Sequence, residues 1–342
     1  MPGHNRSFWV ESTPDKSFQP LTADLTVECC VIGAGITGLT TAYLLQRAGM
    51  KVAVIEMDGI ARGVSGYTTA KVTSLQGTVY SQIESKHGRE AALLYAASNE
   101  AALAQVRALV EELSIACDLE TRSNYTYCED PSDVSKIEQE AEAASRAGLP
   151  VELVHETDLP FDVAAAVRLD GQAQFHPRKY LLGLVDELER GGCLFFDDTR
   201  ATGLEEGEPC VVETTGGKVR ADHVVVATHY TFLDRSVMFP RVHPARSYAM
   251  LGPVDGPVPE GMYLSTEPSW SVRPVRVGDE TLVLTGGAGH NVGQHYDTED
   301  RYAQLEAWSR DKLGMTEVRY RWSTQDGSSV DTLPYIGKLT PV

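Results

Sequence analysis

Long apolar runs are absent from this sequence. No stretch of its 342 residues approaches the roughly 18 apolar residues that a membrane-spanning helix needs. The first residues, MPGHNRSFWVESTPDKSF, also lack the apolar core of a signal peptide. These absences predict a cytoplasmic protein that does not enter a membrane.

Positive charge is scarce. The chain carries 30 lysines and arginines against 48 aspartates and glutamates, which gives a formal net charge of −18. Nucleic acids and anionic membranes would repel such a chain, so we expect neither as a partner. With 42% hydrophobic residues, the chain is long enough to bury the cores of two domains.

Several catalytic motifs are also missing. The sequence has no cysteine–histidine spacing of a metal site, no Gly-x-Ser-x-Gly turn and no glycine-rich lysine loop. We therefore exclude metallohydrolases, serine hydrolases and nucleoside triphosphatases, and we expect no metal. The cysteines show no paired spacing, which favours a reducing compartment over a disulfide framework. They are Cys29, Cys30, Cys117, Cys128, Cys193 and Cys210.

What is present is a βαβ pattern near the N-terminus. Residues 31–40 read VIGAGITGLT, and Glu56 ends the run KVAVIE. This pattern predicts a strand over 26–32, a helix to about residue 48 and a second strand over 51–56. The order of these parts is typical of proteins that bind an adenine dinucleotide.

The residues of this crossover have separate mechanical roles. Gly33 permits the tight turn out of the strand, Gly35 leaves no Cβ between the backbone and a pyrophosphate, and Gly38 lets helix and strand pack closely. The diphosphate would then lie at a helix N-terminus, which favours negative charge. Glu56 can accept hydrogen bonds from both ribose hydroxyls and would repel a 2′-phosphate, which argues against NADP.

The segment after the crossover favours FAD over NAD. An NAD-binding half would continue through a short crossover into a third parallel strand, whereas this chain continues into ARGVSGYTTAKVTS and a long helical stretch. Small side chains, backbone donors and hydroxyls in that loop suit a second pass over a pyrophosphate and a ribityl chain. An ordinary surface turn is the alternative, and NAD stays open because Glu56 serves either dinucleotide.

A family resemblance extends over almost the whole chain. The glycine turn, GVSGYTTAKVTS, GQAQFHP, ADHVVVAT and RWSTQDGSSVDTLPYIG are similar, in this order, to FAD-dependent oxidoreductases of the D-amino-acid oxidase and glycine oxidase superfamily. The resemblance implies FAD as the cofactor, with the backbone near Ala201 approaching the adenine and Ala227 and Thr228 near the phosphates. The residues that we expect to contact FAD are Gly33, Gly35, Ile36, Thr37, Gly38, Glu56, Met57, Gly63, Ser65, Gly66, Thr68, Thr69, Ala70, Lys71, Ala201, Ala227, Thr228 and Gly337.

Two segments, TTAKVTS and WSTQD…LPYIG, look most like the branch whose members often carry a C-terminal Rieske domain. Rieske ligation needs Cys-x-His and Cys-x-x-His pairs, and none of the cysteines has a histidine at either spacing. Family members also continue past LPYIG into a strand, a glycine-rich turn and a helix, whereas this chain stops at Val342. We expect that difference to weaken flavin binding, and a fragment stays open as its explanation.

The expected fold class is α/β: an FAD-binding Rossmann-like domain with an inserted α+β substrate domain on a mixed, largely antiparallel sheet. The chain would enter each domain more than once, because nucleotide-domain patterns return after the helical and strand-rich stretches. The expected segments are 25–80, 165–230 and 325–342 for the FAD domain, 81–164 and 231–324 for the substrate domain, and 1–24 for an extended N-terminal arm.

Two basic residues are candidates for chemistry. The flavin ring accepts the hydride in such enzymes, so the protein holds the substrate over the ring, excludes water and tunes its charge. Lys71 could stabilise reduced, anionic flavin, or be a solvated surface lysine. Arg246 could clamp a substrate carboxylate through its planar guanidinium, or form a salt bridge with one of the many acidic residues.

The other candidates lie on the strand-rich part of the chain. His290, in GGAGHNVGQ, could accept a proton or be a structural turn histidine. Trp322 and Gln325 could wall the pocket with an apolar face and an amide, and Tyr248 is a similar candidate. Plain core packing is the alternative for Trp322 and Tyr248.

These features lead to one function and two alternatives. The first is an FAD-dependent oxidoreductase that transfers hydride from a C–N bond of an amine or amino acid to flavin. The second is a flavin-binding electron-transfer module that works with an iron–sulfur domain or partner and has little activity alone. The third, an NAD-dependent dehydrogenase, rests on Glu56 alone.

Overall fold

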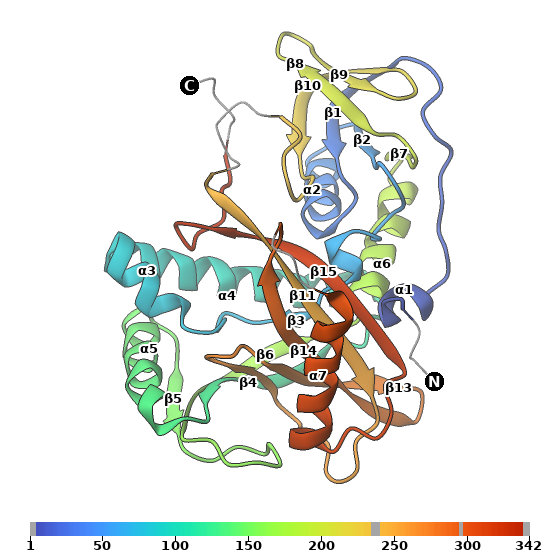
Figure 1. Ribbon diagram of the computed structural model, residues 1–342. Coiled ribbons are helices and arrows are strands. Elements are labelled where there is room, and N and C mark those ends of the chain that lie inside the picture. Colours follow the sequence, from blue (N-terminus) through green and yellow to red (C-terminus); the bar gives the residue numbers. More distant parts are fainter. Residues whose placement is uncertain (1–4, 234–239, 294–296, 338–342) are drawn as a thin grey trace.

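Two β-sheets organise the molecule, one in the upper half and one in the lower half of Figure 1. The computed structural model describes residues 5–233, 240–293 and 297–337. Helices pack on both sheets, which confirms the expected α/β class. None of the described helices is both long and apolar enough to cross a membrane.

The first sheet has six strands in the order β7-β2-β1-β10-β9-β8. The strands from β7 to β10 are parallel, and β9 and β8 are added antiparallel at one edge. The last four residues of β1 are all buried, as expected for a parallel strand covered on both faces. The bounds are β1 (Leu25–Ile32), β2 (Val52–Ile55), β7 (Leu194–Phe196), β8 (Ala201–Glu205), β9 (Cys210–Thr214) and β10 (Lys218–Val226).

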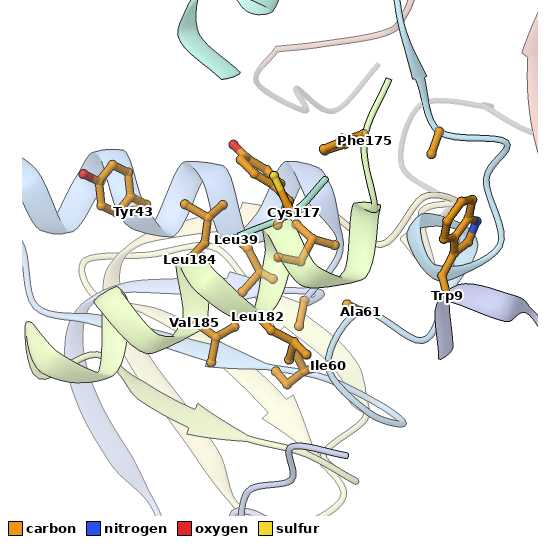
Figure 2. Packing of buried hydrophobic residues seen from close by; sticks show 14 of the residues in the cluster. Trp9, Leu39, Tyr43, Ile60, Ala61, Cys117, Phe175, Leu182, Leu184 and Val185 are labelled. Atoms are coloured by element: carbon orange, nitrogen blue, oxygen red, sulfur yellow. The ribbon is translucent and has the colours of Figure 1, made fainter. Parts of the chain in front are cut away.

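Two helices cover this sheet, α2 (Ile36–Arg47) and α6 (Pro177–Arg190). Leu39 and Tyr43 on α2 belong to one buried cluster with Leu184 and Val185 on α6 (Figure 2). Apolar residues recur on α6 every three to four positions, so one face of that helix is buried. The strand, helix and strand predicted for the N-terminal crossover are therefore confirmed.

The second sheet has nine strands, in the order β15-β11-β14-β13-β12-β4-β6-β3, with β5 also paired to β6. Its pairs are antiparallel except for β12 and β4, so the expected mixed, largely antiparallel sheet is confirmed. The bounds are β3 (Lys71–Val72), β4 (Glu120–Cys128), β5 (Val151–Val154), β6 (Ala165–Gln174), β11 (Val242–Gly252), β12 (Met262–Ser265), β13 (Ser271–Val277), β14 (Glu280–Asn291) and β15 (Tyr320–Ser329).

Four longer helices surround this sheet: α3 (Val79–His87), α4 (Arg89–Glu112), α5 (Val134–Arg146) and α7 (Thr298–Leu313). The long helical stretch is broken between α3 and α4 at Gly88, whose φ of +84° suits glycine. The start of α3 is capped from a distance, since buried Glu140 on α5 accepts hydrogen bonds from two N–H groups of its first turn, at 2.8 Å each. The structure also contains two short 3₁₀ turns, η1 (Val64–Gly66) and η2 (Pro131–Asp133).

The N-terminal segment differs from the extended arm that the sequence predicts. It contains a short helix, α1 (Phe8–Glu11), in which Phe8 and Trp9 are buried. After α1 the chain runs along the outside of the molecule to β1 (Figure 1). The Phe18 N–H donates to the Asp197 carboxylate at 3.0 Å, and the Leu21 N–H donates to the Thr199 hydroxyl at 3.0 Å. The sequence did not predict this helix because residues 1–24 have no regular apolar pattern, and only tertiary contacts bury Phe8 and Trp9.

Strand pairing crosses the expected domain segments at several places. Residues 71–72, 165–174 and 325–329 were expected with the cofactor segments, but they pair within the nine-stranded sheet. Strand β6 belongs to this sheet because β4 pairs with one of its edges, and β3 and β5 also pair with it. Most of its residues are buried there. The division of the chain into domains stays a prediction, and its last residues, 338–342, lie outside the described residues.

Candidate active site

The glycine turn between β1 and α2 packs against the end of β10. A Cβ at Gly33 would lie 2.5 Å from the Ala227 carbonyl oxygen, and one at Gly38 would lie 1.9 Å from the Gly33 carbonyl oxygen. Both contacts exclude any side chain. Gly35 is the N-cap residue of α2 and has no side chain to cap the helix, so N–H groups of the first helical turn after Ile36 can serve an anion.

Glu56 lies at the end of β2, directly beside this turn. Its Oε2 accepts a hydrogen bond from the Ala34 N–H at 2.8 Å, and its Oε1 accepts one from the Asp58 N–H at 3.2 Å. A carboxylate has about four acceptor positions, so this half-buried group keeps capacity for a diol. Its backbone carbonyl accepts from the Thr199 N–H, two residues before Ala201 at the start of β8.

Several predicted cofactor residues surround this turn. The Ala227 N–H donates to the Ile32 carbonyl at 2.8 Å, which brings the end of β10 and Thr228 to the glycine turn. Ile36, Thr37 and Met57 are exposed near the same turn. Gly337, near the end of the described residues, is exposed, and its position would allow a Cβ without contact.

The loop of residues 63–71 connects the glycine turn to the second sheet. It contains the 3₁₀ turn η1, and Ser65 in that turn accepts a hydrogen bond from the Ile36 N–H through its Oγ at 3.0 Å. At its other end, β3 pairs with β6 of the nine-stranded sheet. The loop therefore reaches both halves of the predicted cofactor site.

Carbonyl groups along this loop accept hydrogen bonds from side chains of distant segments. The pairs are Ser7 Oγ to Gly66 O at 2.6 Å, Trp322 Nε1 to Tyr67 O at 2.9 Å, Trp9 Nε1 to Thr68 O at 2.8 Å and Arg273 Nη1 to Ala70 O at 3.1 Å. These bonds fix the path of the loop, because each donor is itself at least partly buried.

A cavity of about 480 Å³ lies between this loop and the nine-stranded sheet. The loop lines it with Thr68, Thr69 and Lys71, and strands β11 and β15 line it with Tyr248, Trp322 and Asp326, among others. Small-molecule sites have this size and this mixture of apolar walls with a few polar groups. The cavity is the candidate active site.

Lys71 carries the positive charge of the cavity. Its Nζ donates to the Tyr263 carbonyl at 2.9 Å and to the Ser271 hydroxyl at 2.7 Å. Burial, and to a smaller extent the nearby Arg273 guanidinium, lower the pKa of Lys71 to about 7. Lys71 is therefore close to its titration point near neutral pH, and an anion in the cavity would favour its charged form.

Asp326 supplies a carboxylate at the same cavity. Side chains alternate along a strand, so Trp322, Thr324 and Asp326 of β15 share one face, and all three line the cavity. Partial desolvation raises the pKa of Asp326, and His229 opposes this effect. The sequence analysis missed Asp326, although its spacing of four from Trp322 in a strand was a usable signal.

The structure does not bring all predicted substrate residues to this cavity. Arg246 donates through Nη1 to the Ser323 hydroxyl at 3.1 Å, and neither Arg246, His290 nor Gln325 lines the cavity. Tyr248 does line it, but its ring stacks on His290 at 5.8 Å between centroids. The physical reason is strand alternation combined with a register shift in β11 beside Arg246, which sequence letters do not show.

The Tyr248 ring also contacts Tyr302 of α7, with 4.8 Å between ring centroids. This part of β11 therefore packs its aromatic side chain against α7, in a small cluster with Met250 and Leu305.

Among the described residues, no group of three or more His, Cys, Asp and Glu side chains is arranged to hold a metal ion.

Curated relatives match most of this chain. It is 32% identical over 337 residues to a protein of Bacillus subtilis (strain 168) named as a putative Rieske 2Fe-2S iron–sulfur protein, YhfW, and the match covers 98% of this chain and 66% of that protein. It is 25% identical over 234 residues to gamma-glutamylputrescine oxidoreductase of Escherichia coli (strain K12), covering 66% of this chain and 55% of that one. The chain thus spans between about half and two thirds of the length of these relatives.

Solved structures share the fold at low sequence identity. Glycine oxidase from Geobacillus kaustophilus superposes with a TM-score of 0.74 at 16% identity, covering 92% of this chain and 86% of that one. L-proline dehydrogenase from P. horikoshii gives a TM-score of 0.72 at 17% identity, covering 94% and 86%.

The family model described as FAD dependent oxidoreductase, DAO, matches residues 28–341, which is nearly the full length. The resemblance stated from the sequence motifs is thereby confirmed, and FAD is the cofactor that this family implies. The chain belongs to the DAO family of FAD-dependent oxidoreductases.

Proposed function

We propose that this chain binds FAD across the glycine turn and the loop of residues 63–71, and oxidises a C–N bond of an amine or amino acid in the adjoining cavity. The observation that carries the proposal is the path of the loop. Ser65 contacts the start of α2, whereas Thr68, Thr69 and Lys71 line the cavity. A cofactor with a diphosphate at one end and a redox ring at the other fits such a path.

The donor set around the crossover fits the adenosine diphosphate part of FAD. The excluded Cβ positions at Gly33 and Gly38 leave bare backbone at the helix start, and Glu56 keeps acceptor capacity for a ribose diol. FAD, when bound, supplies the acceptor for the hydride, because its ring system takes two electrons.

The side chains of the cavity then bind and orient the substrate. Asp326 attracts a cationic amine, and Lys71 attracts negative charge that develops at its end of the cavity. Trp322 adds an apolar wall, with its indole held by the Tyr67 carbonyl at 2.9 Å. Overall, the substrate loses a hydride and a proton from its CH–N unit and becomes an imine, which water can hydrolyse to a carbonyl product and an amine.

An iron–sulfur domain as the electron acceptor is a further part of the proposal. Its support is the Bacillus subtilis relative, which is named as a putative Rieske 2Fe-2S iron–sulfur protein. The presence of a cavity with ionisable walls favours a substrate-oxidising enzyme over a pure electron-transfer module. A cytoplasmic location is proposed because all six cysteines are free and five of them are buried.

The purified chain tests the proposal directly. We expect it to take up FAD and to show flavin absorbance, and we expect an amine or amino acid to bleach that absorbance under anaerobic conditions. Bleaching by dithionite but by no amine or amino acid in a broad panel would favour the electron-transfer module. A chain that does not take up FAD would refute the proposal.

A further inference from the structure

The segment of residues 7–10 precedes the region that the family model matches, which begins at residue 28. It is nevertheless well buried. Ser7 is fully buried and Trp9 is 1% exposed, although both belong to a helix of only four residues and its cap. So short a helix is not stable by itself, so tertiary contacts must hold it.

Those contacts point to the loop of residues 63–71. The Ser7 hydroxyl donates to the Gly66 carbonyl at 2.6 Å, and the Trp9 indole donates to the Thr68 carbonyl at 2.8 Å. The loop is also closely packed here, since a Cβ at Gly66 would lie 3.3 Å from the Val10 side chain. Two carbonyl groups of the loop, those of Gly66 and Thr68, thus receive hydrogen bonds from α1 and its N-cap residue.

Trp9 connects the same loop to the nine-stranded sheet. The Arg273 guanidinium lies over the Trp9 ring, 5.1 Å from its centroid, and also donates to the Ala70 carbonyl at 3.1 Å. The Trp322 ring meets the Trp9 ring edge-on at 6.4 Å, and its indole donates to the Tyr67 carbonyl. Trp9 therefore packs against Arg273 and Trp322, the two side chains of the sheet that donate hydrogen bonds to the loop.

The start of α6 anchors α1 from the other side. The His176 ring lies edge-on to Trp9 at 4.9 Å, and its Nε2 is 3.0 Å from the Ser12 hydroxyl. His176 Nδ1 accepts from the Lys179 N–H at 3.2 Å, so Nε2 is the protonated nitrogen and donates to Ser12. Buried Arg178 donates to the Pro14 carbonyl at 3.0 Å.

We propose that Ser7 and Trp9 are positioning residues of the cofactor site: they hold the loop of residues 63–71 in the conformation that FAD and the cavity require. The inference rests on the proposed function for its cofactor, but the restraint on the loop belongs to the chain itself. Gly66 and Thr68 direct their carbonyls toward α1, and Thr68 and its neighbour Thr69 line the cavity. Loss of the donors on α1 frees the loop at the point where it turns toward the cavity.

Hydrogen exchange of the full-length chain without added FAD tests the restraint. Trp9→Phe keeps an aromatic ring and removes the indole N–H, and Ser7→Ala removes the hydroxyl. Matched controls are Trp308→Phe and Ser309→Ala on α7, which also alter a tryptophan packed on a ring and a buried serine. We expect amides of residues 66–72 to exchange at least about fivefold faster in the two α1 variants only, which is the effect of losing roughly one net hydrogen bond.

The FAD complex gives the second readout. We expect Trp9→Phe and Ser7→Ala to raise the Kd for FAD at least about fivefold and to change the visible circular dichroism of the bound flavin, with both controls like the wild type. Unchanged exchange in residues 66–72 would overturn the inference, and so would equal acceleration in the α7 controls, because that result means general destabilisation. A wild-type chain that binds no FAD refutes the proposed function but leaves the exchange test decisive.

Discussion

Replacing Lys71 with methionine should remove a specific pH dependence of stability. Burial, together with the smaller effect of the Arg273 charge, lowers the pKa of Lys71 from 10.5 to about 7. Between these two pH values the unfolded chain binds a proton that the folded chain does not, so the stability of the wild type rises with pH in this window. Below about pH 7 both states are protonated and this contribution is constant.

The size of the effect follows from the shift. One pH unit inside the window corresponds to about 1.4 kcal/mol, so raising the pH from 7 to 9 should stabilise the wild type by roughly 2 to 3 kcal/mol through this group. Lys71→Met lacks the group and should lack this gain. Methionine has a similar length and fills the same wall of the cavity.

Urea unfolding of the FAD-free chain at several pH values measures this difference. The free energy of unfolding of Lys71→Met minus that of the wild type should fall by roughly 2 to 3 kcal/mol between pH 7 and pH 9. Lys51→Met, at an exposed lysine, is the matched control and should follow the wild type. Parallel curves for Lys71→Met and the wild type would refute the reasoning, because they would mean that Lys71 is solvated.

Four other outcomes can be measured separately. The free energy of unfolding should fall as the pH drops from 6.5 toward 3, because burial lowers the pKa of folded His176 to about 3, so that in this range only the unfolded chain protonates His176. In urea unfolding at several pH values, His176→Asn should show a smaller fall over the same range. Glu140→Gln should lower the free energy of unfolding by about 1 to 3 kcal/mol, since one N–H at the start of α3 loses its acceptor; an unchanged urea midpoint would contradict this. Gly38→Ala should abolish FAD binding because its Cβ would lie 1.9 Å from a main-chain oxygen, whereas Gly207→Ala, whose nearest neighbour is at 3.2 Å, should bind FAD normally in a titration. Asp326→Asn should raise KM for cationic amines with a smaller effect on kcat, and equal KM values would exclude Asp326 as an amine contact.

The parts of this molecule that sequence reasoning predicted are those in which neighbouring residues carry the information. The spacing of Gly33, Gly35 and Gly38 between an apolar strand and Glu56 is typical of a βαβ crossover that binds a dinucleotide, and neighbouring residues alone define it. Glycine and proline mark two further element boundaries locally, because Gly88 is the N-cap of α4 and Pro177 is the first residue of α6.

The parts that sequence reasoning missed depend on long-range contacts. Arg246 and His290 lie opposite each other on paired strands, but a register shift and strand alternation decide which side chains reach the cavity. Trp9 lies in a polar stretch whose burial depends on residues far away in the sequence, such as Arg273. Asp326 shares the cavity face of β15 with Trp322, four residues earlier, so strand alternation would have pointed to Asp326 once residues 322–326 were recognised as a strand.

The pairing of β1 with β10 has a consequence for synthesis on the ribosome. Leu25 on β1 pairs with Val219 on β10, so about 190 residues must be synthesised after β1 before its partner strand β10 leaves the ribosome. During that time the N–H and C=O groups along the β10 side of β1 have no strand to pair with, and exposed strand edges promote aggregation. Heterologous expression at low temperature, or with chaperones that shield nascent chains, should therefore raise the yield of native protein.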